Sequence, residues 1–357
     1  MIRLEPRGVP SRGLALAVPV AAALAALALA AVPLLLAGAP LGRAYAAMAE
    51  GALGSRFALT EVLTRATPLI LTGLAAAVAF RARLYNIGAE GQLYVGALAA
   101  VAVGAGTLDW PTPLLVPAVL GAGALAGAAM MVGPALARVT LGADEVVTTL
   151  LLNFVVLLLV QMMIEGPMKD PMSMGWPQSE PLIDAATLPR LVEKTRLHAG
   201  LLVALAAAGL LHGLMARTVA GFAIRAVGEA PAAARFAGLP VGGTLVAVGA
   251  LSGALAGLAG AGEVAGVKGF LAADLSPGYG YAGIVVAMLA GLSPLGTVAA
   301  ALFVAAVFVG ADSMSRVVNV SSYIANLIVA LSLIAVLVAG VLTRYRLRYA
   351  RRPAAGA

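Results

Sequence analysis

The chain has 357 residues, of which 62% are hydrophobic and 11% are charged, and its mean hydropathy is +1.00. A water-soluble domain is usually about half apolar and about a quarter charged, so this composition excludes a soluble globular protein and predicts a polytopic membrane protein. The absence of Cys excludes disulfides and thiolate metal sites, and two His argue against a transition-metal site. Lys and Arg flanking membrane helices explain the net charge of +7 without nucleic acid.

The first apolar element covers residues 14–38, after a basic segment at residues 1–13. Its 25 residues exceed the roughly 7–15 residues of a signal-peptide core. At about 1.5 Å per residue they can cross a hydrocarbon core of about 30 Å. We therefore expect a retained first transmembrane helix that follows a cytoplasmic N-terminus.

Nine further apolar segments follow, and they predict an all-α fold with about ten transmembrane segments in one domain at residues 14–342. They are Thr67–Phe80, Leu93–Leu108, Pro113–Leu136, Val146–Met163, Ala199–Met215, Leu245–Gly262, Tyr281–Leu292, Leu295–Ala311 and Ile324–Leu342. A full crossing needs roughly 17–25 residues, so Thr67–Phe80 and Tyr281–Leu292 are expected to be broken or half-spanning helices. Irregular backbone at membrane depth occurs where it is buried in protein or lines a cavity.

The cations set the expected orientation. An even number of crossings puts both termini on one side, and that side carries 14 of the 23 Lys and Arg residues. Because cytoplasmic loops carry an excess of Lys and Arg, we expect both termini to be cytoplasmic, with a basic tail at residues 343–357. The loop at residues 165–198 is then external, and the loop at residues 216–242 is cytoplasmic.

Several polar side chains fall within the apolar segments. An ionisable side chain at the bilayer centre costs about 2.5–3.5 kcal/mol on insertion scales, so each such residue needs an explanation. The candidates are Asn86, Glu90, Gln92, Asp144, Glu145, Asn153, Glu263 and Asp312. Asp144 and Glu145 also fit the start of a helix, where acids are favoured. Glu90 is equally compatible with contact to a solute and with accepting hydrogen bonds from nearby backbone at a helix break.

Two Gly-broken segments could form a solute pathway. The first is LYNIGAEGQLYVG at residues 84–96, and the second lies between Glu263 and the tyrosines at 279 and 281. The predicted topology gives the helices before the two breaks opposite directions, which fits two inverted halves whose broken helices meet at a central site. The internal sequence similarity is too weak to establish a repeat. The expected pathway residues are Asn86, Glu90, Gln92, Asn153, Glu263, Tyr279 and Tyr281.

Six motifs between Thr67 and Asp312 resemble permease subunits of ABC importers for nucleosides and simple sugars, within a larger group that includes ribose and branched-chain amino-acid permeases. The motifs are NIGAEGQLYVGALAA, ADEVVTTLLLN, GPMKDP…PQS, RAVGEAPAAARFAGL, SGALAGLAGAGEV and GYGYAGIVVAMLAGLSPLG. The long GPMKDP loop is similar to that of the longer of two permeases in bacterial nucleoside importers.

This resemblance implies a set of partners in the bacterial cytoplasmic membrane. A second, different permease, cytoplasmic ABC ATPases and an extracytoplasmic substrate-binding lipoprotein would complete the importer. ATP and Mg²⁺ would be bound by the ATPase, so this chain is expected to hold no cofactor and not to be an enzyme. Its Lys194-Thr195 pair follows Glu193 instead of the Gly of a phosphate-binding loop.

The cytoplasmic loop resembles the coupling helix of ABC permeases, whose pattern is Glu-Ala-Ala, three residues, then Gly. Residues 232–238 read AAARFAG, so Ala232 stands at the Glu position. The resemblance assigns ATPase coupling to Arg225, Gly228, Glu229, Ala233, Ala234, Arg235 and Gly238. At helical spacing, Ala233, Ala234 and Gly238 fall in one stripe, and we expect them to form the small docking face.

The preference for nucleosides over a sugar such as ribose rests on resemblance alone. A different class of function is an ion-coupled secondary transporter, with Glu90 or Glu263 carrying the ion. A membrane-embedded enzyme is a further alternative, but no cluster of His, Cys or Asp in the sequence supplies a nucleophile or a metal site.

Overall fold

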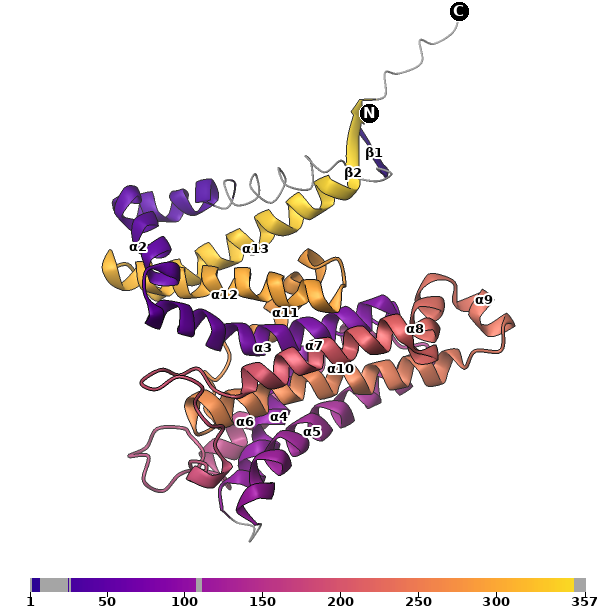
Figure 1. The fold of residues 1–357 in the computed structure, drawn as a ribbon, viewed down its shortest axis with the longest axis horizontal. Helices are drawn as coiled ribbons and strands as arrows, with labels where there is room; N and C mark the ends of the chain where they lie inside the picture. The colour runs from indigo at the N-terminus through magenta and orange to yellow at the C-terminus, as the bar shows by residue number, and fades with distance from the viewer. Residues whose placement is uncertain (1, 7–24, 26, 107–110, 350–357) are drawn as a thin grey trace, which may run out of the picture. The chain divides into compact units, whose positions relative to one another are not determined.

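The computed structural model describes residues 2–6, 25, 27–106 and 111–349. Within these residues the regular secondary structure is helical except for one two-stranded ribbon (Figure 1). In chain order the elements are β1 (Ile2–Pro6), α2 (Leu41–Leu53), α3 (Arg56–Arg81), α4 (Ala89–Gly104), α5 (Thr112–Leu141), α6 (Glu145–Glu165), the 3₁₀ turn η1 (Asp184–Ala186), α7 (Gly200–Arg217), α8 (Val219–Glu229), α9 (Pro231–Phe236), α10 (Val241–Glu263), the π-helix η2 (Val264–Lys268), α11 (Tyr279–Leu289), α12 (Pro294–Val317), α13 (Ser322–Arg344) and β2 (Tyr345–Tyr349). They form two compact units, Met1–Ser55 with Val307–Ala357, and Arg56–Ala306.

The smaller unit has an apolar core and a ribbon that the sequence did not predict. Leu34, Met314 and Ile328 are fully buried in this core. β1 and β2 pair antiparallel, with Ile2 opposite Tyr349. Because the two strands come from opposite ends of the chain, no local sequence pattern predicts their pairing. Residues 14–24 and 26 of the expected first helix lie outside the described part.

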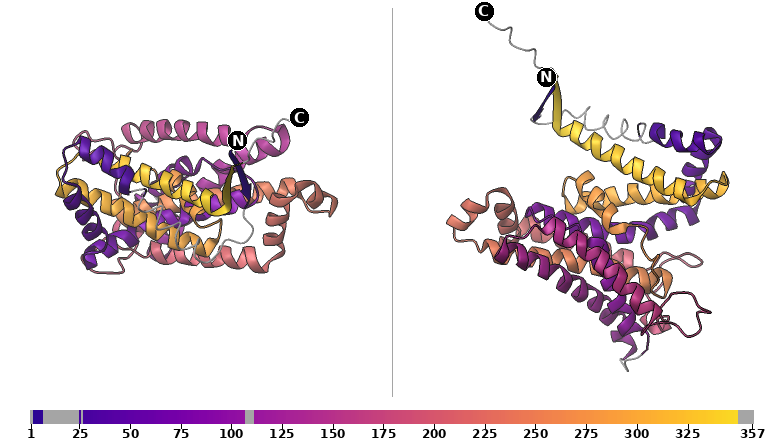
Figure 2. Two further views of the ribbon diagram at one scale, coloured as in Figure 1. Left: turned by 90° about the horizontal axis from the view of Figure 1, so that it is seen from above. Right: turned by 180° about the vertical axis from the view of Figure 1, so that it is seen from behind.

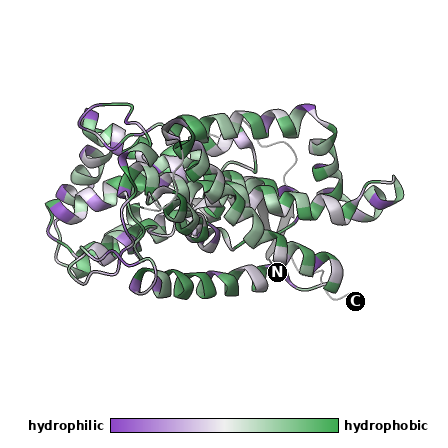
Figure 3. Cartoon of the chain, turned by 90° about the horizontal axis from the view of Figure 1, so that it is seen from below, coloured by the Kyte–Doolittle hydropathy of each residue, from purple (hydrophilic) through white to green (hydrophobic). Residues whose placement is uncertain are grey.

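The predicted membrane architecture is confirmed. Among the described residues, six helices are long and apolar enough to cross a membrane, and four shorter apolar helices accompany them. Hydrophobic residues run along the helices of the larger unit, and hydrophilic ones gather toward their ends and loops (Figure 3). The short helix expected near Tyr281–Leu292 is present as α11, with 11 residues.

The prediction of a short helix at Thr67–Phe80 was wrong. α3 has 26 residues, because it begins a further three turns earlier, at Arg56. The charged residues of that first part made the predicted apolar segment begin too late in the chain, at Thr67. One of them, Glu61, is buried and paired with Arg196 of the long loop, so its charge does not prevent burial.

Small residues bring the helices of the larger unit close together. α10 packs most extensively against α5 and α4 (Figure 2). A Cβ at Gly96 would overlap the backbone of Gly257, and a Cβ at Gly260 would overlap the carbonyl of Leu93. Such glycine contacts allow helix backbones to approach closely. This packing holds α4 against the centre of the unit.

The two long connections of the larger unit lie at opposite ends of α7. The loop at residues 166–199 precedes α7, and α8 and α9 follow it (Figure 1). The 18 residues of α7 separate them by about 27 Å at 1.5 Å per residue. This separation is close to the thickness of a hydrocarbon core, so the two connections can face opposite sides of a membrane.

Candidate functional site

The candidate site is built around the helix break at residues 82–88, between α3 and α4. Arg83 adopts a φ of 55°, and the chain returns to a helix at Ala89. Of the three polar residues predicted here, Asn86 lies in the break and Glu90 and Gln92 lie in the first turn of α4. All three side chains are buried, with exposed fractions of 4% or less. Backbone N–H and C=O groups in the break therefore need partners inside the protein.

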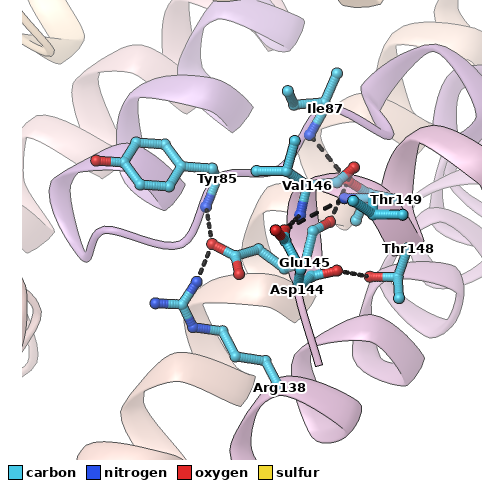
Figure 4. A network of polar contacts seen from close by, with 9 residues as sticks. Tyr85, Ile87, Arg138, Asp144, Glu145, Val146, Thr148 and Thr149 are labelled. Atoms are coloured by element: carbon cyan, nitrogen blue, oxygen red, sulfur yellow. Dashed lines mark hydrogen bonds and ion pairs between the residues drawn. The ribbon is translucent and has the colours of Figure 1, made fainter. Parts of the chain in front are cut away.

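One face of α6 supplies those partners (Figure 4). Glu145 accepts a hydrogen bond from the Tyr85 N–H at 3.1 Å, and Thr149 Oγ1 accepts from the Ile87 N–H at 3.2 Å. The two side chains are four residues apart, so they lie one above the other on the helix. Arg138 of α5 forms an ion pair with Glu145 and compensates its buried charge.

Asn153, four residues farther along α6, completes this face. Its Oδ1 accepts from the Gly91 N–H at 2.9 Å, and its Nδ2 donates to the Ile87 carbonyl at 3.0 Å. Nδ2 also lies 3.2 Å from the Tyr281 hydroxyl of α11. A Cβ at Gly91 would come within 2.8 Å of Asn153 Oδ1, which explains the glycine. Asn153 therefore binds the backbone on both sides of the α4 N-terminus.

The start of α6 confirms that Asp144 and Glu145 open a helix. Asp144 is the N-cap, and its carboxylate accepts from the Val146 N–H at 2.8 Å, as expected. Glu145 lies in the first turn of α6, also as expected, and its buried side chain is in addition a partner of the break. The four-residue spacing of Glu145, Thr149 and Asn153 was a signal that sequence reasoning missed.

A second network joins the break to two other helices. Asn86 Nδ2 donates to Gln92 Oε1 at 2.8 Å and to Ser252 Oγ of α10 at 2.9 Å. Ser252 Oγ in turn donates to the Ala75 carbonyl of α3 at 2.8 Å. Sequence reasoning did not select Ser252, which is fully buried. The amides of Asn86 and Gln92 thus satisfy each other and tie the break to α10.

Glu90 links α4 to α11. Its Oε2 accepts from the Gly280 N–H at 2.7 Å, and a Cβ at Gly280 would overlap the backbone at Glu90. The carboxylate lies in the first turn of α4 and contacts the first turn of α11, where a negative charge is favoured by both helix dipoles. The structure supports the backbone-acceptor alternative for Glu90, and contact with a solute stays a prediction.

α4 also holds the segment between η2 and α11. Tyr94, one turn after Glu90, donates its hydroxyl to the Ala273 carbonyl at 2.7 Å and accepts from the Ser276 N–H at 3.2 Å. Ser276 Oγ accepts from the Tyr279 N–H at 2.9 Å, at the start of α11. The break before α11 is therefore held in place by side chains of α4, the helix that follows the break at residues 82–88.

The long loop pairs with the same segment from its other side. Its backbone N–H groups donate to carbonyls after α10: Ser179 to Leu271 at 2.9 Å, Leu182 to Gly269 at 2.8 Å and Leu188 to Ala265 at 2.8 Å. His198 is fully buried against Gly266, and burial lowers the pKa of its imidazole to about 4, so it is neutral at pH 7. A Cβ at Gly266 would come within 2.4 Å of His198 Nδ1, so this glycine accommodates the loop.

Glu263 belongs to a cluster of charged residues at the end of α10. Its side chain is 5% exposed, and the charges of Arg65, Arg196 and Lys268 act on it. Arg196 Nε also donates to Glu61 at 3.0 Å. Sequence reasoning missed Glu61 and Arg65, because the charged half of α3 precedes the predicted apolar segment Thr67–Phe80. It also missed Arg196, which lies in the long loop.

The predicted pathway residues differ in their exposure. Tyr281 is 40% exposed, whereas Asn86, Glu90, Gln92, Asn153, Glu263 and Tyr279 are each 5% exposed or less. Tyr85, in the break, is 44% exposed and contacts Phe80 edge to face, with ring centroids 5.2 Å apart. At this site the rings of Tyr85 and Tyr281 are therefore exposed, whereas the amides and carboxylates are buried.

The predicted coupling residues differ in how far they are buried. Arg225 donates to the Met215 carbonyl at the end of α7, and a Cβ at Gly228 would overlap the Arg81 carbonyl. Glu229 is exposed. These contacts hold α8 against the C-terminal ends of α7 and α3.

The prediction that Ala234 contributes to an exposed docking face was wrong. Ala234 is 3% exposed and packs with Val227 and Val241, which sets the orientation of α9. Ala233, Arg235 and Gly238 are exposed, and the neighbouring Phe236 is 96% exposed. Sequence reasoning did not select Phe236.

Within the part of the chain that the structure describes, no three His, Cys, Asp or Glu side chains lie close enough to hold a metal ion. The arrangement around the two breaks offers hydrogen-bonding and aromatic groups. These can bind and orient a neutral polar solute.

Comparisons with known proteins identify relatives across nearly the whole chain. The family model described as "Branched-chain amino acid transport system / permease component" matches residues 58–337. The glucose ABC transporter permease protein TsgB13 of Haloferax volcanii is 39% identical over 97% of this chain and 93% of its own length. The guanosine ABC transporter permease protein NupP of Bacillus subtilis is 33% identical over 88% of this chain and 91% of its own. The nucleoside ABC transporter permease protein NupB of Lactococcus lactis is 33% identical over 74% and 75%. No solved structure matches significantly.

The α6 contacts predict a difference between two adjacent threonines. Thr149→Val should leave the partly buried Ile87 N–H without an acceptor, at a cost of about 1–3 kcal/mol, and lower the apparent melting temperature of the purified chain. Thr148→Val is the control, because the Thr148 hydroxyl donates only to the Asp144 carbonyl of its own helix. Equal melting temperatures for the two variants, measured by thermal unfolding in detergent, would contradict the assignment.

Proposed function

The chain belongs to the branched-chain amino acid transport system / permease component family, and on that basis we propose that it forms the translocation pathway of an importer for nucleosides. It is a multi-pass membrane protein and an ABC importer permease. The solute, the sides of the membrane and the partner subunits are the parts of this assignment that are proposed.

The meeting of the two breaks is the observation that supports a pathway most directly. The first turns of α4 and α11 touch at Glu90 and Gly280, and exposed Tyr281 lies beside them. Broken helices whose N-termini meet are the usual setting of a solute site in transporters with two inverted halves. We propose that Tyr281 and Tyr85 contact the solute, while Asn86, Glu90, Gln92 and Asn153 hold the backbone that positions them. Glu263 and Tyr279 then support the outer end of the pathway.

A nucleoside suits this site. Its base can stack on an aromatic ring, and its ribose hydroxyls can exchange hydrogen bonds with tyrosine hydroxyls. Relatives named for guanosine and for nucleosides share 33% identity with this chain. The relative named for glucose shares 39%, so a simple sugar is the second candidate.

The partners follow from the importer class. We propose that α9 faces a cytoplasmic ABC ATPase and that the loop at residues 165–198 faces an extracytoplasmic substrate-binding lipoprotein. A second, different permease would complete the membrane part in the bacterial cytoplasmic membrane, with both termini of this chain in the cytoplasm. ATP would be hydrolysed in the ATPase subunit, so this chain would act without a cofactor of its own.

The solute assignment predicts a competition result. Uptake of labelled guanosine into proteoliposomes that contain the complete importer should require ATP and fall with excess unlabelled adenosine, because both share the ribose. Excess glucose should leave guanosine uptake unchanged. ATP-driven uptake of labelled glucose, with no uptake of guanosine, would replace the nucleoside assignment by the sugar alternative.

The exposed face of α9 predicts a docking residue. A buried aromatic anchor at a protein interface typically costs about 2 kcal/mol or more on truncation, so Phe236→Ala should weaken co-purification of the ATPase by at least about tenfold. Arg235→Ala, next to it, should have little effect, because an exposed ion pair contributes about 0–1 kcal/mol. Undiminished ATPase recovery with Phe236→Ala would show that α9 does not dock in this way.

A further inference from the structure

Arg81 lies where three segments of the larger unit meet, at the C-terminal end of α3. Its Nη2 contacts the carbonyl of Leu292, in the turn between α11 and α12, at 3.4 Å. Its Nε is buried and has no hydrogen-bond partner among the described residues. A single long hydrogen bond therefore holds the guanidinium. Its Nε–H donor stays unused, whereas the donors of a buried arginine with a purely structural role are normally all hydrogen-bonded.

α8 touches the same residue through its backbone. Gly228 lies so close to the Arg81 carbonyl that a Cβ would overlap it, and the Ala82 Cα would be 3.1 Å from that Cβ. Gly228 is three residues before Pro231, where α9 begins. Only Glu229 and Ala230 separate Gly228 from the start of α9. A displacement of α9 is therefore expected to move Gly228 and, through it, the backbone of Arg81.

α11 connects the Leu292 turn to the break. Its 11 residues span about 16 Å, from Gly280, which donates to Glu90, to the turn that Arg81 contacts. α3 packs tightly along it, since a Cβ at Gly283 would come within 2.6 Å of the Thr72 hydroxyl. A short helix held in this way moves as a rigid body more readily than it bends.

We propose that Arg81 is a positioning residue that couples α8 to the Leu292 turn, so that movement of the ATPase-facing helices shifts α11 at the solute site. This inference rests on the proposed docking of α9 to an ATPase. It adds the connection inside the chain, from Gly228 through Arg81 and α11 to Glu90.

A purely structural role makes a different prediction. A cation at the C-terminal end of a helix stabilises that helix through its dipole, whichever residue carries the charge. Loss of that role would reduce folding and assembly but leave the number of ATP molecules hydrolysed per solute unchanged in the complexes that do assemble. A coupling role, in contrast, would change the number of ATP molecules hydrolysed per solute in importer that has folded and assembled.

The experiment compares variants of the complete importer in proteoliposomes. Arg81→Gln removes the guanidinium, and Arg81→Lys keeps the charge on a flexible chain without the planar fork. Arg83→Gln is the matched control, because Arg83 is exposed and two residues away. ATP hydrolysis and import are measured together, with guanosine as the probe, or with glucose if the uptake assay identifies it as the solute.

Arg81→Gln should assemble with the ATPase and hydrolyse ATP, but the ATP consumed per imported solute should rise about fivefold or more, the lower range of coupling between distant sites. Arg81→Lys should restore part of the coupling, and Arg83→Gln should match the unsubstituted importer. An unchanged ratio in Arg81→Gln, an equal rise in Arg83→Gln, or loss of the assembled complex in both Arg81 variants would overturn the proposal. Absence of uptake by the unsubstituted importer would instead count against the proposed function.

Discussion

An interrupted helix in a membrane protein must find partners for the backbone groups that the helix no longer pairs. In this chain the break between α3 and α4 finds them on α6, where Glu145, Thr149 and Asn153 receive the N–H groups of Tyr85, Ile87 and Gly91. Each unpaired group buried in such a medium costs several kcal/mol, which exceeds the contribution of most single side-chain contacts. The break is stable because an intact neighbouring helix supplies the missing bonds.

The rest of the site depends on that arrangement. Fixing the break fixes the first turn of α4, and this places Glu90 against Gly280 and Tyr94 against Ser276. The second break is thereby held by residues of the first, and backbone N–H groups of the long loop donate to the carbonyls of Ala265, Gly269 and Leu271 around it. Most of the polar side chains that stand out in this apolar sequence form hydrogen bonds with backbone groups. The rings of Tyr85 and Tyr281 are the exposed groups of this framework.

The sequence predicted the helices well because apolar length is a local property. The apolar segment at Thr67–Phe80 was cut short, since buried pairs such as Glu61 with Arg196 involve residues far apart in the chain. The same limit applies to the site. Asn86, Glu90 and Gln92 could be selected as polar residues in an apolar context, but their partners Ser252 and Gly280 depend on how α10 and α11 pack.

The short helix α9 shows a related limit. Residues 232–238 identified α9, yet the spacing alone could not decide which side of so short a helix is buried. Packing of Ala234 against Val227 and Val241 decides it and leaves Phe236 exposed. In contrast, the stripe of Glu145, Thr149 and Asn153 was readable from its four-residue spacing.

The central claim is that the break at residues 82–88 is a hydrogen-bonded structure and not an open, flexible hinge. Hydrogen–deuterium exchange of the chain in lipid nanodiscs, followed by mass spectrometry of peptides that cover Leu84 to Gly91, tests it most directly. Because Tyr85, Ile87 and Gly91 donate to side chains of α6, their amides should exchange as slowly as those in the first turns of α6. Exchange of these amides as fast as in an exposed loop would contradict the account.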